Sequence, residues 1–104
     1  TGVVTAEWMP TSRWEGFKGL IHGGILTTLL DEAMAKAVIA LGIPALTCEL
    51  RVRFRAAVRS GTPLTIRGWV TEHRGRRTLT EASLVTAAGE CVHAWGTFIR
   101  VACT

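Results

Sequence analysis

The chain has 104 residues, the length of one small domain, so residues 1–104 are expected to form a single domain. Hydrophobic residues make up 48% of it, which excludes a disordered chain, and no apolar run reaches the roughly 18 residues of a membrane span. The net charge of +4 is uneven, because residues 1–50 carry −2 and residues 51–104 carry +6. The basic half favours a phosphate-bearing partner, either nucleic acid or a nucleotide-containing small molecule.

The three cysteines indicate a reduced protein. Cys48, Cys91 and Cys103 are odd in number and form no CxxC pair, which argues against a disulfide framework and against a zinc site. We therefore expect them to be buried thiols, and we expect no bound metal. No signal peptide or membrane span is visible, so we expect a cytoplasmic protein that has no membrane partner.

The first half of the chain predicts one helix after an irregular lead-in. Residues 1–21 carry scattered apolar positions and turn formers, which indicate irregular structure with one short strand. From Gly23 to Leu41 the apolar residues follow helical periodicity, and Gly42 and Pro44 then end the helix. The predicted buried face consists of Leu26, Leu29, Leu30, Ala33, Met34, Ala37 and Leu41, opposite Thr28, Glu32 and Lys36.

The second half predicts an antiparallel meander. Four strands are expected, over Leu46–Val58, Leu64–His73, Thr78–Thr86 and Cys91–Val101. In the first strand, arginines at positions 51, 53 and 55 should lie on one face, with Val52 and Phe54 on the other. One long helix on a sheet of four or five antiparallel strands is an α+β arrangement.

The start of the helix carries the residues best suited to chemistry. Gly23 and Gly24 would leave unpaired N–H groups at a helix N-terminus, which can stabilise a developing oxyanion. Asp31, the only aspartate, lies at the edge of the apolar face and is a candidate general base or nucleophile. The non-catalytic alternatives are that the two glycines only make a tight helix start and that Asp31 and Glu32 form an ordinary pair on the polar face.

The spacing of these residues constrains any mechanism. Eight helical residues separate Gly23 from Asp31, which is roughly 12 Å along the axis, so one reacting carbonyl cannot touch both. If both act on it, they come from different chains whose helices run antiparallel. A catalytic interpretation therefore predicts a two-fold dimer with two shared sites.

The segment Gly19–Ala33, with its HGG…LxD pattern, resembles the signature of the hotdog-fold thioesterases, the PaaI-like group of the 4-hydroxybenzoyl-CoA thioesterase superfamily. The resemblance implies the hotdog fold, in which an antiparallel sheet wraps around one central helix. It implies hydrolysis of an acyl-CoA thioester in a homodimer or homotetramer, with coenzyme A as part of the substrate and no other cofactor. By position, Gly23 would donate its amide to the carbonyl, Asp31 of the partner chain would act on water, and His22 would shape the helix start.

The chain departs from this family pattern at two helper positions. Gly16 stands where many members have Asn or Gln, and Ala35 stands where many have Ser or Thr. Glu15 or Thr27 could assist the reaction in place of these missing helpers. The losses keep open a non-catalytic acyl-CoA-binding module, whereas a hydratase or dehydratase is disfavoured because no histidine lies at suitable spacing from Asp31.

The basic hairpin Arg74–Thr78 is the second functional feature. Its guanidiniums suit phosphate, and the family resemblance implies that Arg76, Arg77 and Thr78 bind the coenzyme A nucleotide. A merely solvated turn is the alternative. Nucleic-acid binding is not expected, because aromatic residues are not interleaved with the arginines.

The aromatic and histidine residues elsewhere are interpreted mostly as structural. Two further histidines, His73 and His93, have no partner at metal-ligand spacing. Trp69 and Trp95 lie in strands and are expected to pack in the core or at a dimer contact. Candidates to line an acyl pocket are Trp8, Trp14 and Phe17.

Overall fold

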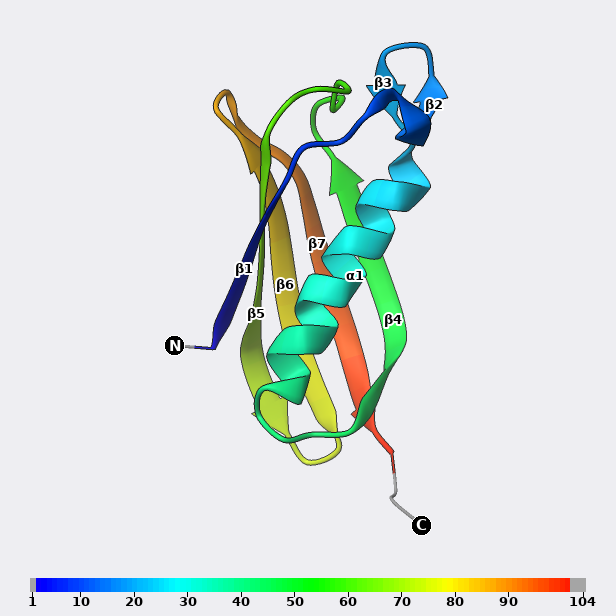
Figure 1. The fold of residues 1–104 in the computed structure, drawn as a ribbon. Helices are drawn as coiled ribbons and strands as arrows, with labels where there is room; N and C mark the ends of the chain where they lie inside the picture. Colours follow the sequence, from blue (N-terminus) through cyan, green and yellow to red (C-terminus); the bar gives the residue numbers. More distant parts are fainter. Residues whose placement is uncertain (1, 102–104) are drawn as a thin grey trace.

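The computed structural model describes residues 2–101, and in it one long helix lies across a twisted antiparallel sheet (Figure 1). The helix is α1 (Gly23–Ile39), and the sheet has the strand order β1-β5-β6-β7-β4. Its strands are β1 (Val3–Trp8), β4 (Ala45–Phe54), β5 (Leu64–Arg74), β6 (Arg77–Thr86) and β7 (Gly89–Arg100). The expected α+β architecture, a sheet curved around a single helix, is confirmed. No helix of the described residues is long and apolar enough to cross a membrane.

The helix buries the face that the periodicity predicts. Its buried residues are Leu26, Leu30, Ala33, Met34, Ala37 and Val38. The predicted end at Leu41 is wrong, because the helix ends at Ile39 and the Leu41 side chain is 50% exposed. Gly42 has a φ of +76°, a left-handed conformation that turns the chain away from the helix axis. This turn directs the chain into β4.

The lead-in contains more regular structure than expected. β1 pairs antiparallel with β5 and so makes the fifth strand of the sheet. A 3₁₀ turn (Ser12–Trp14) and a small hairpin of β2 (Glu15–Phe17) and β3 (Leu20–Ile21) then lead to the helix start. Apolar residues hold four of the six positions of β1, and from Val4 to Trp8 they alternate with polar residues, which is the pattern of the one short strand expected here.

Two glycines let the helix lie close to the sheet. A Cβ atom on Gly68 of β5 would lie 2.6 Å from the backbone carbonyl carbon and oxygen of Ala33. A Cβ atom on Gly96 of β7 would lie 3.1 Å from the Met34 sulfur. Gly68 therefore needs the absence of a side chain, because backbone lies in the way, whereas a side chain at Gly96 would require only side chains, such as the flexible end of Met34, to shift.

The strand β4 forms one edge of the sheet, and most of its residues are exposed. It ends at Phe54, earlier than the predicted Val58, which is buried beyond the strand. The Phe54 side chain is 51% exposed, and Leu46 near the other end is 65% exposed. A long edge strand with exposed apolar residues is a surface that commonly pairs with another chain.

Candidate functional site

The start of α1 presents one free backbone amide. His22 is the N-cap, and its Nδ1 atom accepts a hydrogen bond of 2.8 Å from the Gly24 N–H group. The Gly24 amide is thus satisfied within the chain, and because Nδ1 accepts, the proton of the neutral ring sits on Nε2. Among residues 2–101 the Gly23 N–H group has no hydrogen-bond partner. It remains available to a ligand carbonyl, with the positive end of the helix dipole behind it.

The lead-in holds the His22 ring in this orientation. The His22 N–H group donates a hydrogen bond of 2.9 Å to the Trp14 carbonyl. A Cβ atom on Gly16 would lie 2.8 Å from His22 Cδ2, so the space that a side chain would occupy at this position is taken by the imidazole. The helper side chain that Gly16 lacks would therefore need a different position of His22.

Asp31 lies halfway along α1 and is half-buried. The Thr47 hydroxyl, at the beginning of β4, donates a hydrogen bond of 2.9 Å to Asp31 Oδ1. No cationic side chain forms an ion pair with Asp31 in the described part of the chain. The carboxylate is therefore oriented by one hydroxyl and keeps its second oxygen for a water molecule or a substrate.

Thr47 is the site residue that sequence reasoning missed. Many members of the family have a hydroxyl residue on the helix, one turn after Asp31, but in this chain that position is Ala35, which packs against the core. Thr47 comes from the next element, 16 residues along the chain. The only signal in the sequence is a hydroxyl residue near the start of the strand that follows the helix, and this signal gains meaning only once β4 is packed beside α1.

The two substitute helpers are engaged elsewhere. Thr27 donates its hydroxyl to the Gly23 carbonyl at 2.8 Å. Glu15 accepts a hydrogen bond of 2.6 Å from the Ser60 hydroxyl, and this bond, together with one from the Gly19 backbone, lowers the pKa of the Glu15 carboxyl. Neither residue hydrogen-bonds to Asp31 within the described part of the chain.

The strand β4 connects the two halves of the candidate site. Asp31 and Thr47 meet near its beginning, whereas Phe54 at its end lies beside Gly23, where a Cβ atom would be 3.4 Å from the Phe54 ring. Within one chain Gly23 and Asp31 stay roughly 12 Å apart along the helix, as expected. A complete site on one carbonyl therefore needs Gly23 from one copy and Asp31 from another.

The basic hairpin lies at the other end of the molecule. Figure 1 shows the β5–β6 turn near the C-terminal end of α1, at the opposite end of the molecule from the start of this helix. Arg77 is exposed, and Arg76 Nη2 donates to the Arg100 carbonyl at 3.3 Å. Thr78 is 1% exposed, and its hydroxyl lies 2.8 Å from His73 Nδ1. The two arginines are thus reachable by a phosphate, whereas the Thr78 side chain is enclosed.

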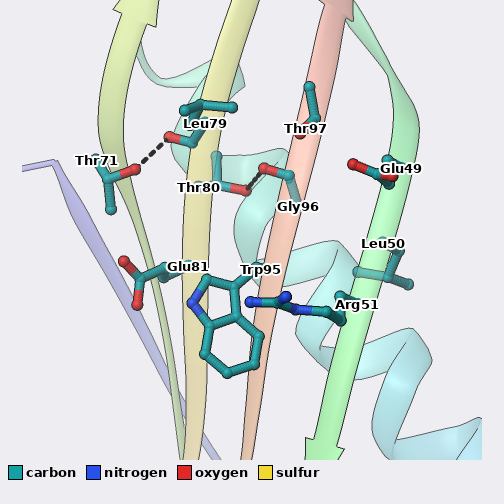
Figure 2. Close-up of a pocket in the computed structure, with 10 residues that line it drawn as sticks. All are labelled: Glu49, Leu50, Arg51, Thr71, Leu79, Thr80, Glu81, Trp95, Gly96 and Thr97. Carbon is teal, nitrogen blue, oxygen red and sulfur yellow. Dashed lines mark hydrogen bonds between the residues drawn. The ribbon is translucent and has the colours of Figure 1, made fainter.

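A pocket of about 590 Å³ lies on the sheet face away from α1, as Figure 2 shows with the helix behind the strands. The Arg51 guanidinium stacks on the Trp95 ring with 4.5 Å between its carbon and the ring centroid. One row of paired residues crosses four neighbouring strands and consists, in order from β5 to β4, of Trp69, Glu81, Trp95 and Arg51. The predicted outward face of the β4 arginines is confirmed for Arg51, but neither Gly23 nor Asp31 reaches this pocket.

His93 has two acidic partners on the sheet, which the sequence did not indicate. Its Nδ1 atom lies 2.8 Å from Glu90 and its Nε2 atom 2.7 Å from Glu81. Burial alone would lower the pKa of His93, but hydrogen bonds and charges of both glutamates outweigh burial and raise it. Since both ring nitrogens face a carboxylate, the doubly protonated imidazolium satisfies both contacts. The two carboxylates thus hold the His93 ring in place, which agrees with the structural role expected for it.

The cysteines and lead-in aromatics differ partly from expectation. Cys91 is buried as predicted, Cys48 is exposed, and Cys103 lies outside the described residues. Trp8 is half-buried against the core, whereas Phe17 is 76% exposed. Among residues 2–101, no group of three or more His, Cys, Asp and Glu side chains is arranged so that it could hold a metal ion.

Comparison with known proteins assigns the family. Residues 18–93, which include the helix start and Asp31, match the family model of the thioesterase superfamily. The chain belongs to the thioesterase superfamily. The resemblance noted in the HGG…LxD segment is thus confirmed at the level of the superfamily.

Individual relatives agree with this assignment. Uncharacterized protein C26H8.11c of Schizosaccharomyces pombe is 32% identical over 101 residues, which cover 88% of this chain and 56% of that protein. The crystal structure of RHA08564, a thioesterase superfamily protein, is 30% identical with a TM-score of 0.89, over 94% of this chain and 49% of that one. The chain thus spans about half the length of these two relatives.

A third structure shows that the fold is the same at lower identity. A hypothetical thioesterase protein from Streptococcus pneumoniae TIGR4, crystallised with coenzyme A, is 22% identical with a TM-score of 0.92. The match covers 97% of this chain and 82% of that one. The superfamily member described by residues 2–101 therefore has the hotdog fold of one helix held by a curved antiparallel sheet.

Proposed function

We propose that this superfamily member hydrolyses the thioester of a small or medium acyl-CoA or aryl-CoA at a site shared between two copies of the chain. One observation carries the proposal. The Gly23 amide, which has no hydrogen-bond partner among the described residues, lies at one end of β4, and the Asp31 carboxylate lies at the other end. The first supplies a donor for an oxyanion, and the second supplies a base.

The edge strand β4 supports the dimer that this site requires. Antiparallel pairing of β4 with the same strand of a second copy would satisfy its free backbone groups and cover the exposed Leu46 and Phe54 side chains. The same two-fold arrangement would bring the beginning of one β4 to the end of the other. Asp31 and Thr47 of one copy would then approach Gly23 of the other.

The proposed chemistry uses groups of both copies. Asp31 takes a proton from a water molecule while the water oxygen bonds to the thioester carbonyl carbon, and Gly23 N–H donates to the oxyanion that forms. Collapse of this intermediate breaks the carbon–sulfur bond. The proton passes from Asp31 to the departing thiolate, so the products are a free acid and the coenzyme A thiol. Thr47 orients Asp31 for the first step.

Binding of the coenzyme A portion rests on Arg76 and Arg77. Each chain holds its own basic hairpin at the end opposite to Gly23. In the antiparallel dimer, the hairpin of the second copy would stand at the same end as Gly23 of the first. Arginine side chains suit phosphate through charge and paired hydrogen bonds. The coenzyme A-bound relative from Streptococcus pneumoniae supports this ligand class.

The experiment is thiol release from a panel of alkyl-CoA and aryl-CoA thioesters, with the wild type beside Asp31→Asn and Asp31→Ala. We expect release by the wild type and a loss of at least about a hundredfold in kcat for both variants, because removal of a general base typically costs this much. Affinity for the acyl-CoA, measured by calorimetry on the variants, should remain within about threefold.

Other outcomes would assign a different function. Binding without release by the wild type would identify a non-catalytic acyl-CoA-binding module. Hydration of an enoyl-CoA without release of thiol would identify a hydratase. Equal loss of affinity and turnover in the Asp31→Asn variant would refute the role of Asp31 as a base.

A further inference from the structure

We propose that Phe54 is the specificity-determining residue of this site, selecting acyl groups whose first three carbons after the thioester carbonyl are all apolar over acyl groups that carry a carboxylate in this stretch. The proposal rests on the shared site described above. Phe54 is the last residue of β4, and its side chain is 51% exposed in the single chain.

The geometry places the Phe54 ring beside the amide that would bind the carbonyl. A Cβ atom on Gly23 would lie 3.4 Å from Phe54 Cζ and 3.5 Å from Cε1, which is ordinary van der Waals contact. The ring thus lies close to the first residue of α1, at the edge of the space that a side chain on Gly23 would occupy. An acyl group whose carbonyl oxygen accepts from Gly23 N–H places its next carbon atoms within reach of this ring.

An aromatic wall in this position discriminates by chemistry. Carbon atoms of the acyl group lose water and gain dispersion contacts against the ring. A carboxylate in the same place loses water and gains no hydrogen bond from the ring, which disfavours it. The discrimination requires that Phe54 face the ligand. In the proposed dimer the second copy covers Phe54 at the end of β4 that lies beside Gly23, so the ring would line the shared site.

The test compares butanoyl-CoA with succinyl-CoA, whose acyl chains both have four carbons and differ in the terminal carboxylate. Two quantities are measured for the full chain with each substrate, kcat/KM from thiol release and affinity from calorimetry. Each quantity is then expressed as the ratio of butanoyl-CoA to succinyl-CoA. The variants are Phe54→Ala, Phe54→Leu, and the control Val3→Ala, which truncates a 53% exposed apolar side chain on the opposite edge strand β1.

We expect the wild type to favour butanoyl-CoA by about tenfold or more. Phe54→Ala should reduce this preference at least about threefold, Phe54→Leu should retain most of it, and Val3→Ala should leave it unchanged. Unfolding in urea checks that all three variants are folded.

The outcomes separate this inference from the proposed hydrolysis. Thiol release whose substrate preference is the same in Phe54→Ala as in the wild type would overturn the role of Phe54 and leave the hydrolysis standing. An affinity preference that depends on Phe54, without any thiol release, would overturn the hydrolysis and leave the role of Phe54 standing. Absence of both binding and release would overturn both.

Discussion

The close contact between Gly68 and α1 makes Gly68→Ala a sharp test of how the helix is held. The added methyl group would lie 2.6 Å from the Ala33 backbone, several tenths of an ångström inside any normal contact, and backbone cannot rotate away as a side chain can. Overpacking of this kind costs about 3 kcal/mol at the upper end, and the lower entropy of the unfolded alanine chain returns about 0.5–1 kcal/mol. The net loss should be about 2 kcal/mol in the free energy of unfolding.

The assay is urea unfolding at fixed protein concentration, because association with a second copy would contribute to stability. A loss of this size lowers the melting temperature by about 10 °C in a domain of this length. Gly96→Ala is the matched control, since its methyl group would meet the flexible end of Met34 at 3.1 Å and the Thr80 hydroxyl at 3.0 Å. A Gly68→Ala variant as stable as Gly96→Ala would refute the argument that Ala33 backbone sets the helix position.

Three further predictions concern the site and the sheet. Thr47→Val removes the hydroxyl that donates to Asp31 at 2.9 Å, and kcat for thiol release should fall about tenfold. Thr47→Ser should keep most of the wild-type kcat. An unchanged kcat in the valine variant would contradict the orienting role of Thr47. His22→Ala removes the N-cap acceptor of Gly24, and urea unfolding should show a loss of about 1 kcal/mol that His22→Asn largely restores. The raised pKa of His93 means that its contribution to stability is full below its usual value of 6.5 and is lost as pH rises through the higher folded value. Urea midpoints measured across this range should therefore fall with rising pH in the wild type more than in His93→Gln, and parallel curves would contradict the assignment.

Much of the fold could be predicted because it follows local rules. The apolar repeat of α1 has the 3.6-residue period of a helix, and the turns at residues 60–63, 74–77 and 87–90 separate apolar runs of strand length. The errors lie at element ends. Leu41 continues the apolar period, yet the chain has already left the helix there, since the left-handed Gly42 directs it to β4.

The lead-in shows the limit of such rules. The lead-in, predicted as irregular with one short strand, contains β1, whose pairing with β5 links residues about sixty positions apart. The run Val4–Trp8 alternates apolar and polar residues, which indicates a short strand. Its pairing partner cannot be read from the local sequence.

The candidate site divides in the same way. The sequence by itself determined that Gly23 stands at a helix start, that Asp31 follows at a spacing too long for one chain to use both, and that His22 precedes them, because spacing along a helix is a property of the backbone. The capping of Gly24 by His22 is equally local, since the two residues are two positions apart. It is the packing of α1 on the sheet that brings Thr47 to Asp31 and Phe54 to Gly23. The last two contacts join α1 to β4, and they depend on the angle at which the helix crosses the sheet. That angle is set by packing of the whole core and not by any short stretch of residues.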